Sequence, residues 1–310
     1  MKKTWLSAVA AGTLLLGACG NTEEDNATES TDDQLTVYAS TFALKSMAEE
    51  IGGDRVNVEM VIPPGADPHT YEPTSKQMTQ IAEADLFLTI GHDLEPYVES
   101  MEKSLEGQNV AFVKTAEDVA LLDASDTVHV HEEDGPDHGQ YDPHVWLDPM
   151  NAVSMAEAVE AAFREEAPDY KDEFADRLST FKDEANTLDA ELKAAVENGS
   201  KSELLVTHAA YGYLAERYGF EQLPIAGLTP SEEPSQQALK RIIEEARLHD
   251  LNYIAFEDTV TPKVAEVVKE EIGAESVTIY NLESVTKEQM DKSYFDLMRE
   301  NVKALEVALK

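Results

Sequence analysis

The sequence predicts an α/β protein with two similar lobes, each built on a parallel β-sheet, joined by one long rigid helix. Three observations predict this fold class. Strand-like runs alternate with amphipathic helical runs from Leu35 onward, the same alternation resumes after residue 199, and residues 168–198 carry one unbroken helical stripe. Because open α/β sheets bind ligands beyond the carboxyl ends of their strands, we expect a binding site in the cleft between the lobes.

The first lobe is expected over residues 35–165. Its strands are predicted at 35–41, 56–62, 85–91 and 109–115, with helices at 42–52, 75–84 and 94–107. The right-handed crossover rule places these helices on the faces of a parallel sheet. Residues 123–143 then form a polar loop rich in Asp, Gly and His, long enough to be functional or disordered rather than a simple connector.

The joining helix is expected over residues 166–198. Its apolar side chains recur every three or four residues, at Tyr170, Phe174, Leu178, Phe181, Ala185, Leu188, Leu192 and Val196. At 1.5 Å per residue, the stretch 168–198 makes a rod of about 46 Å, which is longer than one lobe requires. We therefore expect it to run along both lobes; a helix packed within one half is the alternative.

The second lobe is expected over residues 199–310. Its strands are predicted at 203–209, 252–258 and 275–282, and its helices at 211–219, 234–250, 262–273 and 293–310. Pro262 opens one of these helices and Gly273 closes it, while Ser235 is available to cap another. Two similar halves joined by a rigid element are typical of a binding protein.

The first 34 residues are predicted to be a targeting signal followed by a flexible tether. Residues 1–18 have a basic start and a short apolar run, as a signal peptide does, and no apolar run is long enough to span a membrane. The stretch 16–19, Leu-Gly-Ala-Cys, resembles a bacterial lipobox, which implies cleavage before Cys19 and a lipid on its sulfur. A plain secretory signal with an incidental cysteine is the alternative. Residues 19–34 are acidic and predicted to be flexible.

Composition excludes several classes of protein. The chain has 62 acidic and 24 basic residues, a formal net charge of −38, so phosphate backbones would repel it and nucleic acid binding is not expected. Cys19 is the only cysteine, which excludes an intramolecular disulfide and any Cys-based zinc cluster. The sequence has no nucleophile elbow, Walker loop, glycine-rich dinucleotide turn or HExxH motif, and we do not expect the protein to be an enzyme.

Three of the eight histidines lie at predicted junctions between a strand and a helix, namely His69, His144 and His208. Pro68 and Pro143 precede the first two and stiffen the backbone there, as rigid metal ligands require. Junctions of this kind gather at the carboxyl edges of the sheets. These histidines are therefore the candidate metal ligands.

A carboxylate is expected to complete the site. Glu283 directly follows the last predicted strand, and Glu257 and Asp258, which end the strand before it, compete for the role. Three imidazoles and one carboxylate suit tetrahedral zinc, whereas manganese and magnesium prefer more oxygen. Copper would bind such a set at least as tightly, so affinity alone does not choose the metal.

Outer residues are also predicted. Asp142, Asp148 and Glu257 are expected to orient ligand imidazoles. The segment 129–144 adds further histidines beside several acids, so we expect it to collect cations loosely as an auxiliary metal loop; an acidic loop with chance histidines is the alternative. The residues of this auxiliary loop are His129, His131 and His138.

The motifs PHTYEPTS (68–75), HVWLDP (144–149) and THAAYGYLAERYG (207–219) resemble the zinc/manganese substrate-binding lipoproteins of bacterial ABC importers. The resemblance runs from about Leu35 to the C-terminus and implies two α/β lobes, one rigid helix and a metal between the lobes. Position by position, it implies His69, His144, His208 and a late carboxylate as ligands. Histidine at 208 resembles the zinc-type members, and YNLESVTKE (280–288) resembles zinc-type lipoproteins of Gram-positive bacteria, which supports Glu283.

We therefore expect an extracytoplasmic receptor, lipid-anchored to the cell membrane, that captures Zn²⁺ and delivers it to an ABC permease with a cytoplasmic ATPase. A monomer is expected. Three alternatives stay open: a manganese receptor of the same family, a zinc hydrolase and a surface adhesin. Because imidazoles must be neutral to bind metal, capture is expected to weaken as pH falls through about 6.5 or below.

Overall fold

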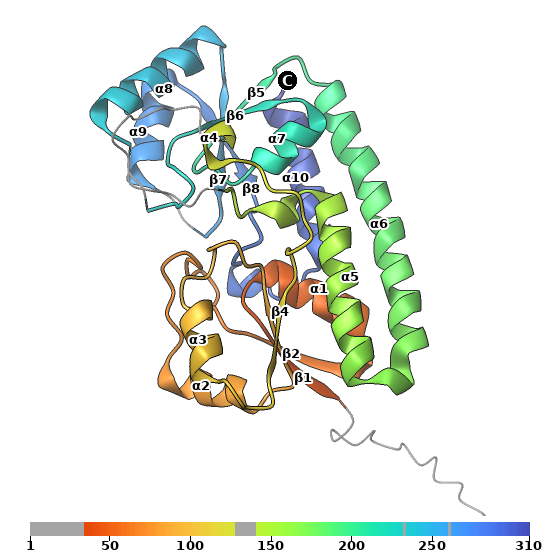
Figure 1. The fold of residues 1–310 in the computed structure, drawn as a ribbon. Helices are drawn as coiled ribbons and strands as arrows, with labels where there is room; N and C mark the ends of the chain where they lie inside the picture. Colours follow the sequence, from red (N-terminus) through yellow and green to blue (C-terminus); the bar gives the residue numbers. More distant parts are fainter. Residues whose placement is uncertain (1–33, 128–140, 232–233, 260–261) are drawn as a thin grey trace, which may run out of the picture. The chain divides into compact units, whose positions relative to one another are not determined.

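The computed structural model describes residues 34–127, 141–231, 234–259 and 262–310, and residues 34–310 belong to one compact unit. Within this unit lie two four-stranded parallel sheets of matching strand order, β2-β1-β3-β4 and β6-β5-β7-β8. Helices flank both sheets (Figure 1). The predicted α/β class with two similar parallel-sheet lobes is confirmed.

The first sheet consists of β1 (Leu35–Ala39), β2 (Val56–Met60), β3 (Leu86–Thr89) and β4 (Ala111–Lys114). Its accompanying helices are α1 (Phe42–Gly52), α2 (Ser75–Ala82), α3 (Val98–Ser104) and the short α4 (Ala124–Thr127), with a 3-10 turn, η2 (Gly53–Arg55), after α1. Sequence signals fix these starts: the Thr41 hydroxyl caps α1, and Thr74 with Gln77 forms a capping box on α2.

The second sheet consists of β5 (Glu203–Val206), β6 (Glu221–Pro224), β7 (Tyr253–Glu257) and β8 (Glu275–Ile279). Its helices are α7 (Gly212–Tyr218), α8 (Gln236–Leu248), α9 (Lys263–Ile272) and α10 (Tyr294–Ala308), with the 3-10 turn η5 (Lys287–Gln289) before α10. The sequence analysis missed β6. That strand has four residues and ends in a proline, which an edge strand tolerates because its outer N–H needs no partner.

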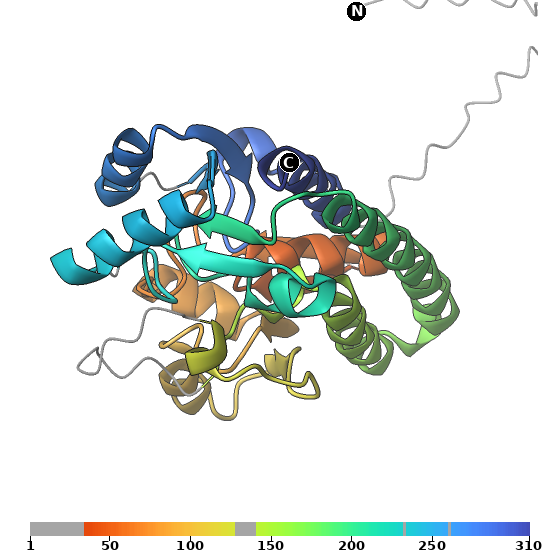
Figure 2. The same cartoon turned by 90° about the horizontal axis from the view of Figure 1, so that it is seen from above.

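The long helix is α6 (Lys171–Glu197), preceded by the 3-10 turn η4 (Pro168–Tyr170) and by α5 (Pro149–Glu166), itself entered through η3 (Val145–Leu147). Its predicted stripe is buried from Phe174 to Leu192. The helix packs against α1 and α5 on the side of the first sheet and against α10 on the side of the second (Figures 1 and 2). The alternative of a helix packed within one half is therefore wrong.

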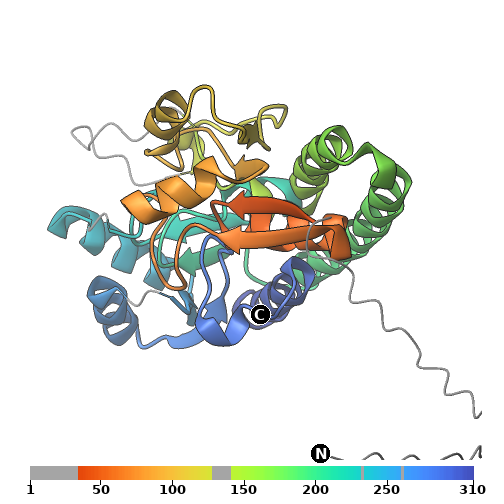
Figure 3. The ribbon, with the colours of Figure 1, turned by 90° about the horizontal axis from the view of Figure 1, so that it is seen from below.

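One large apolar core joins the two sheets, with contributions from α1, α5, α6 and α10. Two smaller cores lie on the other faces, one under α2 and α3 and one under α8 and α9. Figure 3, seen from below the view of Figure 1, shows the first sheet and α2 in front, with α5, α6 and α10 beside them. Among the described residues, none of the helices has the length and hydropathy that a membrane span requires.

Candidate metal centre

The loop between β2 and α2 carries His69. The Asp67 side chain accepts the backbone N–H of His69 at 2.9 Å, which fixes the turn around Pro68. Gly65 has a φ of 80°, the left-handed conformation that favours glycine, and its N–H donates to the Ser284 hydroxyl at 2.8 Å. The His69 side chain is 8% exposed. The loop is thus held against the segment that follows β8.

His144 lies just before η3 and is fully buried. Asp142 Oδ1 accepts two hydrogen bonds from it, one from the backbone N–H at 2.9 Å and one from Nδ1 at 2.7 Å. The Tyr213 hydroxyl in α7 donates to the carbonyl of Asp142 at 2.7 Å. With Nδ1 donating to a carboxylate, the Nε2 lone pair of the neutral ring faces the site, as a metal ligand requires.

His208 follows β5 and is also fully buried. Its Nδ1 donates to Glu257 Oε1 at 2.5 Å, and the Thr207 hydroxyl donates to the same oxygen at 3.1 Å. Glu257 ends β7, which pairs in parallel with β5. The two side chains therefore meet because the strands end at the same edge of the sheet.

Glu283 follows β8 on a loop shaped by Asn281 and Leu282. Leu282 is fully buried with a φ of 59°, a left-handed conformation that costs a residue with a side chain about 1–3 kcal/mol. The carbonyls of Leu282 and Glu283 accept the backbone N–H groups of Ala43 and Phe42, both at 3.0 Å. The loop thus leaves the second sheet but caps the first helix of the first lobe, which fixes Glu283 relative to that lobe.

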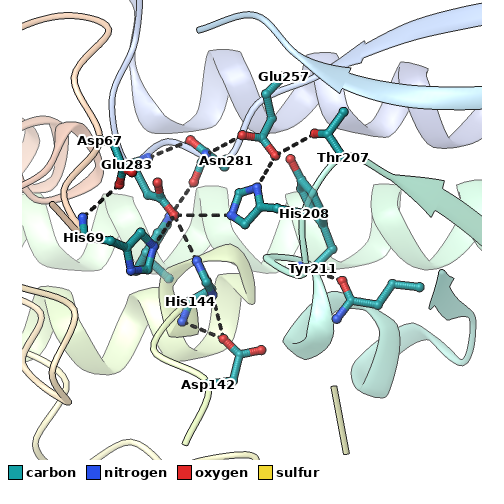
Figure 4. Close-up of polar contacts among 12 residues, drawn as sticks. Asp67, His69, Asp142, His144, Thr207, His208, Tyr211, Glu257, Asn281 and Glu283 are labelled. Atoms are coloured by element: carbon teal, nitrogen blue, oxygen red, sulfur yellow. Dashed lines mark hydrogen bonds and ion pairs between the residues drawn. The ribbon is translucent and has the colours of Figure 1, made fainter. Parts of the chain in front are cut away.

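The three imidazoles converge on one oxygen of Glu283 (Figure 4). Glu283 Oε1 lies 2.9 Å from His144 Nε2, 3.5 Å from His69 Nε2 and 3.7 Å from His208 Nε2. All four atoms are buried and lack a hydrogen bond of normal geometry. Orphaned polar atoms in an interior are costly, so their convergence indicates a site for a ligand that satisfies all four. The donor set, three nitrogens and one oxygen, is that of tetrahedral zinc.

The carboxylates strongly bias the protonation of this cluster. Burial alone would lower the pKa of His144, but Asp142 and Glu283 outweigh it and raise that pKa to about 9. Burial is likewise outweighed at His208, where Glu257 and Glu283 raise the pKa to about 10. Burial would raise the pKa of Glu283, yet the three imidazoles that face its carboxylate hold it well below its usual range. Protons therefore take the place of a cation in the metal-free cluster.

The cluster brings together the three candidate histidines of the sequence analysis. Of the carboxylates that competed to complete the site, Glu283 is the one that faces them. Asn281 is a residue that the sequence analysis missed. The signal for it was present: in Asp-Pro-His, Asp-Pro-His and Asn-Leu-Glu, the first side chain accepts the backbone N–H of the candidate ligand two residues later, at 2.9, 2.9 and 3.0 Å. This Asx turn is a local way to aim a side chain from a loop.

The expectation for Asp148 needs correction. Its carboxylate accepts the Met150 N–H at 2.8 Å as the N-cap of α5, and it pairs with Arg217 Nε at 3.1 Å. Oδ1 of Asp148 thus contacts a helix N–H and a guanidinium rather than an imidazole. Asp258 likewise lies beside Glu257 without joining the four converging atoms.

Two further histidines are engaged elsewhere: His92 Nε2 contacts the carbonyl of Ala116 at 2.9 Å, and His249 pairs with Glu203 at 2.8 Å. The predicted auxiliary loop, His129, His131 and His138, lies outside the described residues, as does Cys19.

The chain matches the sequence model of a protein family described as zinc-uptake complex component A, periplasmic, over residues 37–308. It is 34% identical to the high-affinity zinc uptake system protein ZnuA of Bacillus subtilis, with 100% of this chain and 99% of that protein covered. It is 30% identical to the zinc-binding lipoprotein AdcA of Streptococcus pneumoniae, over 98% of this chain but only 60% of AdcA.

Solved structures agree with this match. The Zn(II)-bound ZnuA-like domain of S. pneumoniae AdcA superposes with a TM-score of 0.75 at 28% identity, covering 89% of this chain and 99% of that domain. The laminin-binding protein Lmb of Streptococcus agalactiae, described as bifunctional with adhesin and metal transporting activity, gives 0.80 at 28% identity, covering 89% of this chain and 100% of Lmb.

Proposed function

Since the chain belongs to the family of zinc-uptake component A, we propose that His69, His144, His208 and Glu283 together bind the Zn²⁺ that it carries. The chain is a zinc-binding receptor of an uptake system, and zinc is its cargo. One observation carries the assignment of ligands: His69 Nε2, His144 Nε2, His208 Nε2 and Glu283 Oε1 are buried and unsatisfied, and the three nitrogens lie 2.9–3.7 Å from that oxygen.

Zinc suits this cluster in charge as well as in geometry. The carboxylates of Asp142, Glu257 and Glu283 lie beside the imidazoles and hold His144 and His208 protonated in the metal-free protein. A Zn²⁺ ion carries the same charge as two such protons. Exchange of two protons for one zinc therefore leaves the charge of the buried cluster unchanged, and avoids the large cost of adding net charge to an interior.

The donor set also bears on the alternatives. A hydrolytic zinc site needs an open coordination position for water, whereas three imidazoles and Glu283 fill a four-coordinate site. We therefore assign the chain no enzymatic activity. Manganese prefers more oxygen donors than this set supplies, which disfavours a manganese receptor. An adhesin role is held as the weaker alternative, supported only by the likeness to Lmb, which is described as bifunctional with adhesin and metal transporting activity.

The wider arrangement that we propose is supported by the family match and by the lipobox-like stretch of the sequence. The receptor passes zinc to an ABC permease driven by a cytoplasmic ATPase, which the match to a zinc-uptake component supports. It acts outside the cytoplasm as a monomer, held to the membrane by a lipid on Cys19 and the tether 19–34. Residues 35–165 form one lobe, residues 199–310 the other, and residues 166–198 link them.

Competition calorimetry tests this proposal on the metal-free chain beginning at Gln34, which comprises the compact unit. We expect one Zn²⁺ to bind far more tightly than Mn²⁺, and His208→Ala and Glu283→Ala to weaken zinc binding strongly. His249→Ala is the matched control, because that histidine pairs with Glu203 outside the cluster, and it should leave zinc binding unchanged. Comparable affinity for manganese, or little change in His208→Ala, would overturn the proposal.

A further inference from the structure

Asn281 makes three different hydrogen bonds in the interior behind the metal cluster. The residue is 5% exposed. Its side-chain oxygen accepts the backbone N–H of Glu283 at 3.0 Å, its side-chain nitrogen donates to Glu257 Oε2 at 2.9 Å, and its carbonyl accepts Trp146 Nε1 at 2.7 Å. Figure 4 shows Asn281 between Glu283 and Glu257, facing the imidazole of His208.

Each of these bonds leads to a different ligand. The first fixes the backbone of Glu283 itself. The second holds Glu257, whose other oxygen accepts Nδ1 of His208 at 2.5 Å. The third holds Trp146, two residues after His144 in the same fully buried turn. One side chain and its own carbonyl thus connect ligands from both lobes.

The chemistry of the position calls for an amide. The Glu283 N–H requires an acceptor, and the Glu257 carboxylate requires a donor, so the orientation of the amide is determined by its partners. A carboxylate at 281 would satisfy the N–H but face Glu257 with like charge. An apolar side chain would leave both partners unsatisfied in the interior.

We propose that Asn281 is a positioning residue for zinc: it holds Glu257, and through it His208, in register with Glu283. The inference rests on the proposed function, because it assigns a role toward the ligands named there. Without the Asn281 donor, Glu257 loses the bond that restrains its second oxygen, and His208 loses the fixed orientation that its carboxylate partner gives it. Loss of an orienting partner of a metal ligand typically weakens metal binding about 10–100-fold.

An exchange of hydrogen-bonding groups tests the proposal. Asn281→Asp removes the donor toward Glu257, and Glu257→Gln removes the carboxylate that receives it, so we expect each to weaken zinc binding about 10–100-fold. In the double variant, the amide at 257 can donate to the carboxylate at 281, which restores the bond with its direction reversed and the total charge unchanged. We expect the double variant to bind zinc at least about 10-fold more tightly than the two separate losses predict.

Asn301→Ala is the matched control. Asn301 is fully buried, and its side-chain amide hydrogen-bonds the backbone N–H and C=O of Tyr280, the residue before Asn281, at 2.7 and 2.8 Å. These bonds involve neither Glu257 nor the proposed zinc ligands. It should lower the thermal stability of the metal-free protein while its zinc affinity stays within about threefold of the wild type. Absorption spectra of the Co²⁺-loaded proteins give a second readout, since the intensity of the visible bands reports tetrahedral coordination.

The outcomes separate the two proposals. If the wild type fails to bind one zinc tightly, the proposed function fails. If the wild type binds zinc and the two losses simply add in the double variant, the positioning role of Asn281 is wrong. The same conclusion follows if Asn281→Asp keeps both the zinc affinity and the Co²⁺ spectrum of the wild type.

Discussion

The two lobes orient their histidines in different ways. In the first lobe, Asp142 and His144 are two residues apart, and one carboxylate oxygen accepts both the backbone N–H and the ring Nδ1. In the second lobe, His208 depends on Glu257, which lies 49 residues further along the chain on the neighbouring strand. The first arrangement is local and exists wherever the turn forms, whereas the second requires the sheet to be assembled.

The loop of Glu283 makes the contrast sharper. By sequence it follows the second sheet, but its carbonyls cap α1, and the Ser284 hydroxyl accepts the N–H of Gly65 in the loop of His69. Among the described residues, His69, His144 and Glu283 are accordingly the group whose possible ligand atoms all lie within 4.8 Å of one another. Three of the proposed ligands are thus tied to one lobe, and His208 faces Glu283 from the other.

The largest expected effect comes from changing Glu283, the residue that all three imidazoles face. Glu283→Gln replaces the carboxylate that faces all three imidazoles with a neutral amide. Zinc affinity should therefore fall by more than about 100-fold, which exceeds the loss expected when only an orienting partner is removed. His208→Ala should cost less, because the three ligands tied to the first lobe remain. Competition titration of both variants measures the difference. An equal or larger loss in His208→Ala would contradict the division into three ligands and one.

Acidification should weaken zinc binding through His144 of the first lobe and His208 of the second alike. Because the pKa of His144 is raised to about 9 and that of His208 to about 10, both rings are protonated in the metal-free protein at pH 7. Zinc must displace these protons, so affinity should fall about 10-fold per pH unit for each proton displaced as pH decreases from about 9. The window expected from the sequence, around pH 6.5, moves upward because of the neighbouring carboxylates.

Calorimetry in buffers of different ionisation enthalpy counts the protons released and should give about two at pH 7. The metal-free protein supplies a control. Both pKa values exceed the 6.5 of an unfolded histidine, so their contribution to stability is complete below about pH 6.5 and is lost as pH rises through 9–10. A zinc affinity that does not change between pH 7 and 9 would contradict the displacement of protons.

A smaller effect separates the two aspartates of the first lobe. Asp142→Asn should weaken zinc binding about 10–100-fold, because His144 loses its charged orienting partner. Asp148→Asn should leave zinc affinity nearly unchanged and lower the free energy of unfolding by no more than about 1 kcal/mol, since asparagine also caps helices and the pair with Arg217 is partly exposed. Denaturant unfolding and zinc titration of both variants check this. Equal losses of zinc affinity would restore Asp148 to the site.

A smaller loss of zinc affinity than in Asp142→Asn is expected when the hydrogen bond between the lobes is removed. Trp146→Phe removes the indole N–H that donates to the carbonyl of Asn281 and leaves that buried acceptor unsatisfied. The free energy of unfolding should fall by about 1–3 kcal/mol, with only a few-fold loss of zinc affinity because no ligand or charged partner is removed. A loss of affinity as large as that of Asp142→Asn would mean that this bond, rather than the carboxylates, sets the geometry.

The sequence was sufficient for the candidate ligands because parallel strands bring their carboxyl ends to one edge, so His208 and the junctions bearing His69 and His144 had to be near a common cleft. It was insufficient for the bonds that tie the lobes together. Trp146 and Asn281 are 135 residues apart, and no local pattern predicts their contact. Leu282 gives no sign in the sequence of its left-handed backbone, which tertiary packing imposes.

Asp148 illustrates a local signal given the wrong role. An aspartate directly before a proline that opens a helix is the pattern of an N-cap, and the structure places Asp148 there. Asp142 also precedes a proline, but the residue after that proline is His144 in a turn rather than a continuing helix. Both carboxylates accept the N–H two residues later, so the distinction lies in what that residue is: a histidine in a turn after Asp142, and the first turn of a long helix after Asp148.

X-ray absorption at the zinc K-edge of the loaded protein tests the central claim most directly, because it reports the number and type of atoms around the metal. Our account predicts one zinc with four nitrogen or oxygen neighbours at about 2.0–2.2 Å, and outer-shell scattering from three imidazoles that falls to two in His208→Ala. Five or six neighbours, or the same imidazole count in His208→Ala as in the wild type, would contradict it.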